Sequence, residues 1–516
     1  MNHYRSIGVF CRKSAIFCRN APMFFLFSST IMSTSLLVLL VLFLYFLLLF
    51  AVARYGNRGT DGGDNEMFFR AARRAPWPLV AFGMVGASIS GVSLISVPGW
   101  VATTCMSYLQ MCMGFILGYI IVAFVLLPVY YRLRLTSIYG YLEQRFGNRT
   151  HRTGALFFLL SKLTGAAARL YVVCMVLHAF VFRPFGLAFP LTVVFVLLLI
   201  WLYTRHSGIG AIVRTDALQT FCLLLAVFGI LWSVMRQLDF GIVEAWKAVA
   251  DSPMSQVFVW DPASPQYFWR QFLSGIFIVI VMTGLDQDMM QKNLACASLR
   301  DAQKDMCFYG LAFVPVNALF LALGVLLHIF CANHGISVPV RGDDLLPSLV
   351  SAGVLGAWVT IPFVLGIISA AFSSADSAIA SLTTSLCVDI FRRPADVRLR
   401  RWLHVLVVVA FVAVIMVFRA LQGGNAIDLI YTMAGYTYGP LLGLFAYGLL
   451  TRRPVLDRWV PLVCVFSPVV CAILDHFAPI WWGYCFGYEL LMLNGLLTVA
   501  LLFLFKGSAG STANVR

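Results

Sequence analysis

The sequence predicts an all-helical protein that crosses a membrane many times. Of its 516 residues, 61% are hydrophobic and only 11% are charged. Soluble domains carry roughly 45–50% apolar and about 25% charged residues, so this composition excludes a soluble fold. Apolar stretches long enough to cross a bilayer core of about 30 Å recur along the chain. Because lipid offers no partner for free backbone groups, these stretches are expected to be helices.

About thirteen candidate spans follow from length and hydropathy. They lie at 32–53, 78–97, 107–130, 153–181, 187–204, 211–235, 268–285, 306–331, 354–388, 402–420, 428–450, 459–477 and 484–505. Residues 506–516 are expected to form a short cytoplasmic tail. Residues 1–31 are interpreted as a doubtful extension, with Met32 as the expected true start.

The net charge of +15 follows membrane topology rather than nucleic-acid binding. Lys and Arg lie in short loops that alternate with loops poor in basic residues. The basic loops hold Arg54, Arg58, Arg70, Arg73 and Arg74, then Arg132 to Arg152, Arg392 to Arg401, and Arg452 to Arg458. The positive-inside rule then places the amino terminus outside and the carboxyl terminus in the cytoplasm, which agrees with an odd number of spans. We expect a multi-pass protein of the inner membrane, with the lipid bilayer as its surroundings and no nucleic acid as partner.

The second span is unusually rich in glycine and serine between Gly83 and Gly99. Small residues allow two helices to pack closely. They also allow a broken helix, whose unwound carbonyls coordinate a cation near the middle of the membrane. The sequence leaves both interpretations open.

The ninth span places small and hydroxyl side chains on one helical face. Ala370, Ser373, Ser374 and Ser377 share that face, and Asp376 lies among them. A carboxylate at the centre of a membrane helix costs at least about 2.5 kcal/mol and usually marks an ion path. Neutral oxygens with at most one carboxylate are the ligands that suit a hard monovalent cation.

The sixth span contains another carboxylate, Asp216, close to its predicted start. Either Thr215 or Asp216 caps the helix, or Asp216 is an ion ligand. The sequence favours neither interpretation.

Five segments together resemble the sodium:solute symporter family, which includes sodium-coupled proline, glucose and sialic acid transporters. They read ASISG at 87–91 with PG at 98–99, LTSIYGYLEQRFG at 135–147, TDALQ at 215–219, DQDMMQ at 286–291 and AAFSSADS at 370–377. The resemblance implies one transporter domain over 32–505. Its LeuT-type core would be two inverted five-helix repeats over 78–450, with peripheral helices at 32–53, 459–477 and 484–505.

The resemblance also implies a sodium site between the first and eighth core helices. Carried over position by position, its ligands are the carbonyls of Gly86, Ile89 and Ala370 and the hydroxyls of Ser373 and Ser374. A second site, present in some members, maps to Asp216, Ser373, Asp376 and Ser377. The serine that is common at position 376 in members with that site is an aspartate here, as it is in many members of the family. Sodium is the coupling ion, and no other cofactor is expected.

Clues to the cargo are fewer. Ser88 stands where proline transporters carry an important aspartate, which argues against proline. Arg169 lies deep in the fourth span, where its guanidinium can clasp a carboxylate; the alternative is an ion pair with Asp216 or Asp376. Lys162, two turns away, is interpreted as reaching the membrane interface. Ser90, Ser93 and Tyr431 are further candidates for solute contact, and Tyr431, Tyr436 and Tyr438 are expected either to line or gate the cavity or to serve in packing.

These observations predict sodium-driven import of a small organic solute by alternating access, with an anionic solute such as an acidic sugar as the favoured cargo. A proton-coupled or facilitative transporter of the same fold remains an alternative. A membrane solute sensor is another, although it would need a signalling domain. An enzyme is not expected, because the histidines form no group with a nucleophile or metal ligands.

Overall fold

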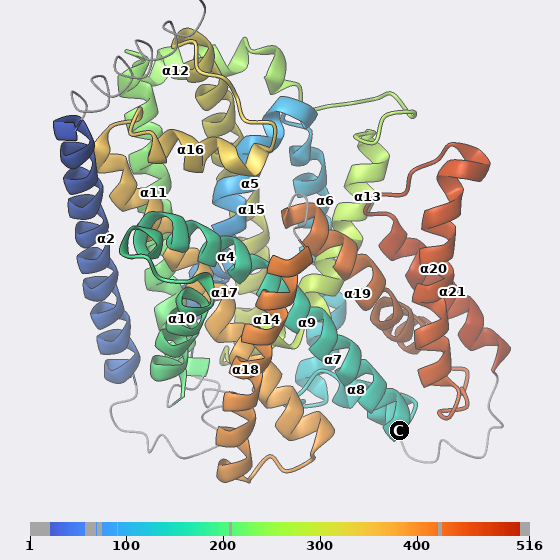
Figure 1. Cartoon of the computed structure of the whole chain (residues 1–516). Helices are drawn as coiled ribbons and strands as arrows, with labels where there is room; N and C mark the ends of the chain where they lie inside the picture. Colours follow the sequence, from blue (N-terminus) through green and yellow to red (C-terminus); the bar gives the residue numbers. More distant parts are fainter. Residues whose placement is uncertain are drawn as a thin grey trace, which may run out of the picture.

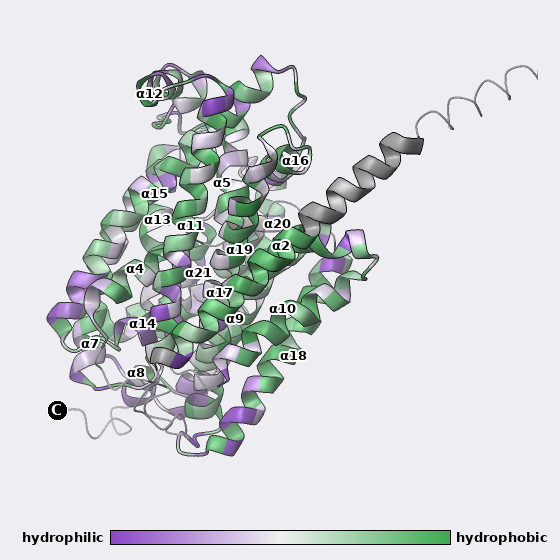
Figure 2. Ribbon diagram, turned by 90° about the vertical axis from the view of Figure 1, so that its left-hand side faces the viewer, coloured by the Kyte–Doolittle hydropathy of each residue, from purple (hydrophilic) through white to green (hydrophobic). Residues whose placement is uncertain are grey.

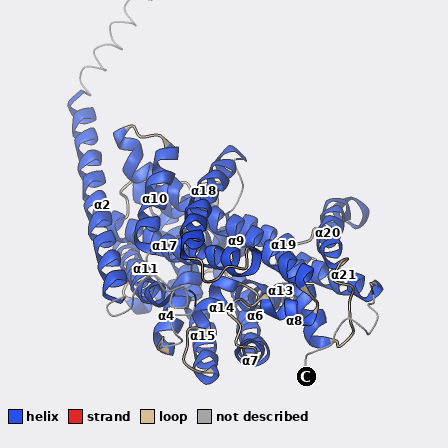
Figure 3. Ribbon diagram, turned by 90° about the horizontal axis from the view of Figure 1, so that it is seen from below, coloured by secondary structure: helices blue, strands red, loops and turns tan. Residues whose placement is uncertain are grey.

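The computed structural model describes residues 21–56, 69, 75–89, 91–205, 209–421 and 426–505. Ser90, residues 1–20 of the expected extension and the expected tail 506–516 lie outside these ranges. Helices make up the framework throughout, and the described ranges contain no β-strand beyond one isolated bridge between Ala75 and Cys296 (Figure 3).

The first five core helices begin with a broken one. Helix α4 (Trp77–Ser88) and helix α5 (Gly91–Thr104) meet at a bend of 57°. The other four crossings are α6 with α7 (Tyr108–Ile121 and Leu127–Arg132), α9 (Asn148–Leu177), α10 (Phe189–Thr204) and α11 (Ile209–Gln237). The short helix α8 (Gly140–Arg145) lies between α7 and α9.

The next five core helices begin in the same way. Helix α13 (Phe268–Val279) continues through a π turn to Gly284 and then bends by 70° into α14 (Gln287–Asn293). The others are α15 (Leu299–Asn333), α17 (Thr360–Ser385), α18 (Val397–Leu421) and α19 (Ala426–Leu450). Since each set makes five crossings, the second set starts on the opposite side from the first. The two sets therefore form the predicted inverted pair.

Peripheral helices flank this core, as Figure 1 shows. They are α2 (Ala21–Gly56), α20 (Val460–Trp482) and α21 (Leu490–Leu504), with short helices α12 (Ile242–Ala250) and α16 (Leu345–Ser351) at one end of the bundle. Burial marks α17 as the centre of the bundle: its most apolar window is 94% buried, whereas those of the peripheral helices α2 and α20 and of the core helix α18 are each 28% buried. Hydrophobic residues cover the helices and hydrophilic ones gather in the loops at the ends (Figure 2).

Every predicted span overlaps a described helix or bent pair. Among the described residues, eight helices are long and apolar enough to cross a membrane, or ten if each bent pair counts as one span. Helices α10 and α21 are shorter apolar helices. The predicted seventh span, 268–285, agrees with the structure, where the straight segment runs from Phe268 to Gly284 and the chain then bends into α14. Hydropathy missed α14 because its sequence, QDMMQKN, is mostly polar.

Candidate solute and ion site

The glycine-rich second span is both interrupted and closely packed, whereas cation coordination by its carbonyls stays a prediction. Helix α4 ends at Ser88, which leaves its last carbonyls without donors from its own helix. The same helix also packs closely on α11: a Cβ placed on Gly86 would lie 1.9 Å from Oγ1 of Thr220. The interrupted end of α4 thus packs directly against α11.

The second break is built around Asp286. This residue is the N-cap of α14, and its Oδ1 accepts hydrogen bonds from the backbone N–H groups of Asp288 (2.9 Å) and Met289 (3.4 Å). Its Oδ2 accepts a hydrogen bond from the Tyr438 hydroxyl at 2.6 Å. A single carboxylate therefore caps α14 and binds α19.

Lys162 is buried in this region, so its expected placement at the membrane interface is wrong. Its residue exposure is 8%, and its Nζ lies 3.1 Å from Oδ2 of Asp286 and 2.7 Å from Oδ2 of Asp288. Burial of an ammonium group is tolerated only with such partners. Lys162 thereby joins α9 to α14.

Asp216 is an ion-pairing residue rather than a helix cap. Helix α11 begins at Ile209, so Asp216 lies in its second turn. Its Oδ2 lies 2.8 Å from Nζ of Lys292, and its Oδ1 accepts a hydrogen bond from the Ser373 hydroxyl at 2.7 Å. Lys292, 1% exposed, was not among the predicted site residues. No hydropathy or motif signal marked it, since it follows the family segment at 286–291.

The hydroxyl face of α17 meets both breaks. The Ser374 hydroxyl donates to the carbonyl of Ala87 at 3.3 Å, near the end of α4. The Ser377 hydroxyl lies 3.2 Å from Oδ2 of Asp288 on α14. Asp376 accepts a hydrogen bond from the Tyr203 hydroxyl at 2.8 Å. The face predicted from helical spacing is therefore buried, in contact with both broken helices and with α11.

The buried charges of this region do not cancel. The carboxylates are Asp216, Asp286, Asp288 and Asp376, and the ammonium groups are Lys162 and Lys292. With every group ionised, the described cluster carries an excess of two negative charges. An uncompensated charge is costly to bury, so the cluster has the electrostatics to accept a cation or protons.

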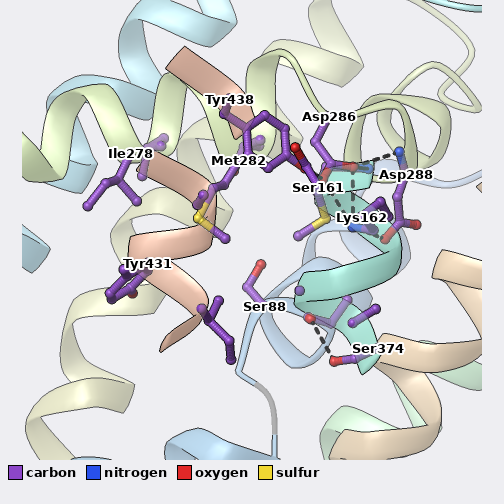
Figure 4. A pocket seen from close by; sticks show the side chains of 18 of the residues that line it. Ser88, Ser161, Lys162, Ile278, Met282, Asp286, Asp288, Ser374, Tyr431 and Tyr438 are labelled. Carbon is purple, nitrogen blue, oxygen red and sulfur yellow. Dashed lines mark hydrogen bonds and ion pairs between the residues drawn. The ribbon is translucent and has the colours of Figure 1, made fainter. Parts of the chain in front are cut away.

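A central cavity of about 90 Å³ lies against this cluster (Figure 4). Ser88, Ser374, Lys162 and Tyr431 line it, and so does Arg169. Ser93 does not line it.

Among the described residues, Arg169 makes no ion pair or hydrogen bond. The alternative of an ion pair with Asp216 or Asp376 is wrong, because Asp216 pairs with Lys292 and Asp376 binds Tyr203. Arg169 is half-buried and lines the central cavity with its charge unmatched by a carboxylate of the described chain.

The three tyrosines of α19 that were candidates for the cavity divide between two roles. Tyr431 and Tyr438 line the cavity. The Tyr436 hydroxyl instead donates to Asp475 of α20 at 2.7 Å, which is a packing contact between peripheral and core helices. Ser88, at the end of α4, shares a short hydrogen bond with the Tyr309 hydroxyl of α15.

Known proteins resemble this chain along most of its length. A putative sodium-dependent multivitamin transporter of Drosophila melanogaster is 24% identical over 391 residues, 72% of this chain and 64% of that protein. The sodium/sialic acid symporter NanT of Aliivibrio fischeri is 25% identical over 439 residues, 80% of this chain and 83% of that protein. The chain thus spans less than two thirds of the length of the fly protein.

The fold has solved counterparts. A substrate-bound, outward-open structure of a Na⁺-coupled sialic acid symporter superposes with a TM-score of 0.73 at 20% identity, covering 90% of this chain and 97% of the other. This likeness confirms the predicted LeuT-type fold of a polytopic membrane transporter. The family model described as "Sodium:solute symporter family" matches residues 68–454, and the chain belongs to that family.

Proposed function

We propose that this protein is a sodium-coupled symporter that imports a small anionic solute, of the acidic-sugar class, by alternating access across the inner membrane. Its amino terminus would lie outside and its carboxyl terminus in the cytoplasm, as the basic loops predict. Family membership supports the sodium coupling. The observation that carries the choice of solute is the guanidinium of Arg169 on the wall of the central cavity.

Arg169 fits a carboxylate for a physical reason. Arginine presents a planar pair of N–H donors that matches the two oxygens of a carboxylate. In the described chain the nearby carboxylates are already used: Asp286 and Asp288 by Lys162, and Asp216 by Lys292. A solute carboxylate would supply the missing partner. Sialic acid, named for two relatives and for the solved symporter, is a carboxylate-bearing sugar and the natural first probe.

The first sodium site would lie where α4 meets α17. Its proposed ligands are the carbonyls of Gly86, Ile89 and Ala370 and the hydroxyls of Ser373 and Ser374. The hydrogen bond from Ser374 to the carbonyl of Ala87 supports this, because it brings a hydroxyl of α17 to the end of α4. Such neutral oxygens, from an interrupted helix and a hydroxyl face, suit sodium.

The second proposed sodium site would use Asp216, Ser373, Asp376 and Ser377. Asp216 and Ser373 are hydrogen-bonded to each other, which supports the grouping. Sodium at this site would share Asp216 with the ammonium of Lys292. The excess negative charge of the cluster would offset the repulsion between the two cations.

Counterflow and uptake in proteoliposomes test the proposal. We expect uptake of radiolabelled sialic acid with sodium and at most a leak when choline replaces sodium. Uptake that is equal in choline would overturn sodium coupling and favour the proton-coupled or facilitative alternative.

The solute class is tested separately with Arg169→Ala. We expect this variant to lose sialic acid uptake far more than uptake of a neutral sugar such as galactose. An equal loss of both would show that Arg169 does not select for a carboxylate.

A further inference from the structure

A second cavity, which we name the outer vestibule, lies toward the end of the bundle where Figure 1 shows α12 and α16. Residues that line it include Trp100, Thr103, Tyr108, Gln266, Arg341 and Tyr488. Its volume is about 360 Å³, against about 90 Å³ for the central cavity. Pockets that hold small ligands measure roughly 300–1,000 Å³. Of these two cavities, the outer vestibule is the one with room for a sugar-sized solute.

Two tyrosines separate the outer vestibule from the central cavity. Tyr108 lines the vestibule and Tyr431 lines the central cavity, and their hydroxyls are 3.2 Å apart in a hydrogen bond. The ring of Tyr488, also in the vestibule, packs edge-on against Tyr431 with centroids 5.0 Å apart. This hydrogen bond therefore lies at the boundary between the two cavities.

The wall of the outer vestibule is fixed by backbone packing. A Cβ placed on Gly99 of α5 would lie 2.1 Å from the carbonyl oxygen of Gly342, so the loop that carries Arg341 rests directly on α5. A wall held in this way loses little conformational freedom when a ligand binds.

The lining has the groups that a polyhydroxylated carboxylate requires. The guanidinium of Arg341 makes no ion pair with the described residues, and Thr103 and Gln266 add a hydroxyl and an amide. The rings of Trp100 and Tyr488 offer apolar faces to a sugar ring. Asp343 also lines the cavity, so the charge is mixed rather than a general anion attractor.

We propose that the outer vestibule is an entry site, where Arg341 binds the carboxylate of the transported solute before the Tyr108–Tyr431 pair opens. This inference rests on the proposed function, since it takes the same solute class. It adds a second binding step, with its own arginine, to the one at Arg169.

Cysteine protection tests the entry site independently of transport. Thr103→Cys would be introduced into the full chain and labelled with a membrane-impermeant maleimide, with labelling of the parent chain subtracted. Sialic acid is the probe and galactose the neutral comparison. We expect sialic acid to protect the new cysteine, also when Arg169→Ala has disabled the central site. Adding Arg341→Ala should raise the protecting concentration about ten- to a hundredfold.

Arg236→Ala, which removes an exposed arginine in the last turn of α11, is the matched control and should leave protection unchanged. The entry-site proposal is overturned if Arg169→Ala alone abolishes protection of the new cysteine by sialic acid. It is also overturned if Arg341→Ala leaves the protecting concentration unchanged. Sodium-driven uptake of sialic acid without any protection also overturns it, and leaves the proposed function standing. Absence of both uptake and protection refutes the proposed solute class, and the entry site with it.

Discussion

The two broken helices of the core interrupt the membrane in chemically opposite ways. At the α4–α5 break, the groups on offer are neutral: backbone carbonyls and the hydroxyls of Ser88 and Ser374. At the α13–α14 break, Asp286 and Asp288 bring carboxylates and the chain supplies its own cations, Lys162 and Lys292. A neutral break suits an ion that enters and leaves, whereas an acidic break with resident ammonium groups suits a permanent junction.

The largest loss of stability is expected at the charged α13–α14 break. Lys162→Met would leave Asp286 and Asp288 buried without their shared cation, and removing one partner of a buried pair costs about 3–5 kcal/mol. We expect a large fall in the melting temperature of the purified protein and loss of uptake. Lys247→Met, on the exposed face of α12, is the control. Equal melting temperatures for the two variants would show that the junction is not needed for stability.

The second effect concerns the ion pair between α11 and α14. Asp216→Asn and Lys292→Met should each destabilise the protein, and the double variant should be less destabilised than the sum of the two. Contacting residues of this kind show coupling energies of about 0.5–3 kcal/mol. Thermal unfolding of all four proteins gives the coupling. Additive effects would mean that the 2.8 Å pair contributes no interaction energy.

The neutral break should respond to shape rather than to charge. Gly86→Ala places a methyl group 1.9 Å from Oγ1 of Thr220, and such overpacking costs about 1–3 kcal/mol. Gly165→Ala, where the added methyl group would meet nothing within 4 Å, is the matched comparison for stability. Because alanine favours a helix over glycine, Gly165→Ala should not lower the melting temperature. An unchanged or raised melting temperature for Gly86→Ala would show that the added methyl group does not strain the contact between α4 and α11.

The smallest change in the free energy of unfolding is expected for Asp376→Asn. Asp376 lies in the same buried cluster and has a hydroxyl partner. Asp376→Asn keeps an oxygen to accept the hydrogen bond from Tyr203, and it removes a negative charge from a cluster that has an excess of them. Its effect on the free energy of unfolding should be within about 1 kcal/mol. Asp216→Asn is the comparison. A larger loss for Asp376→Asn than for Asp216→Asn would place the essential charge on α17 instead of α11.

Much of the fold could be predicted because a membrane-spanning helix is recognised by an apolar stretch long enough to cross the bilayer. Each span predicted from that signal overlaps a described helix or bent pair, but the signal missed α14, which is short and mostly polar. Helical spacing predicted the hydroxyl face of α17 correctly. It did not predict that Lys162 turns inward or that Lys292 meets Asp216, because both contacts join residues far apart in sequence. No local pattern records such contacts.

Asp286 has a consequence that reaches beyond its own helix. Its carboxylate simultaneously holds the first turn of α14, the ammonium of Lys162 on α9 and the hydroxyl of Tyr438 on α19. Three helices thus share two oxygen atoms, and none can shift without leaving a partner unsatisfied. The Asp286 carboxylate therefore couples the three helices, and α9, α14 and α19 are expected to move together.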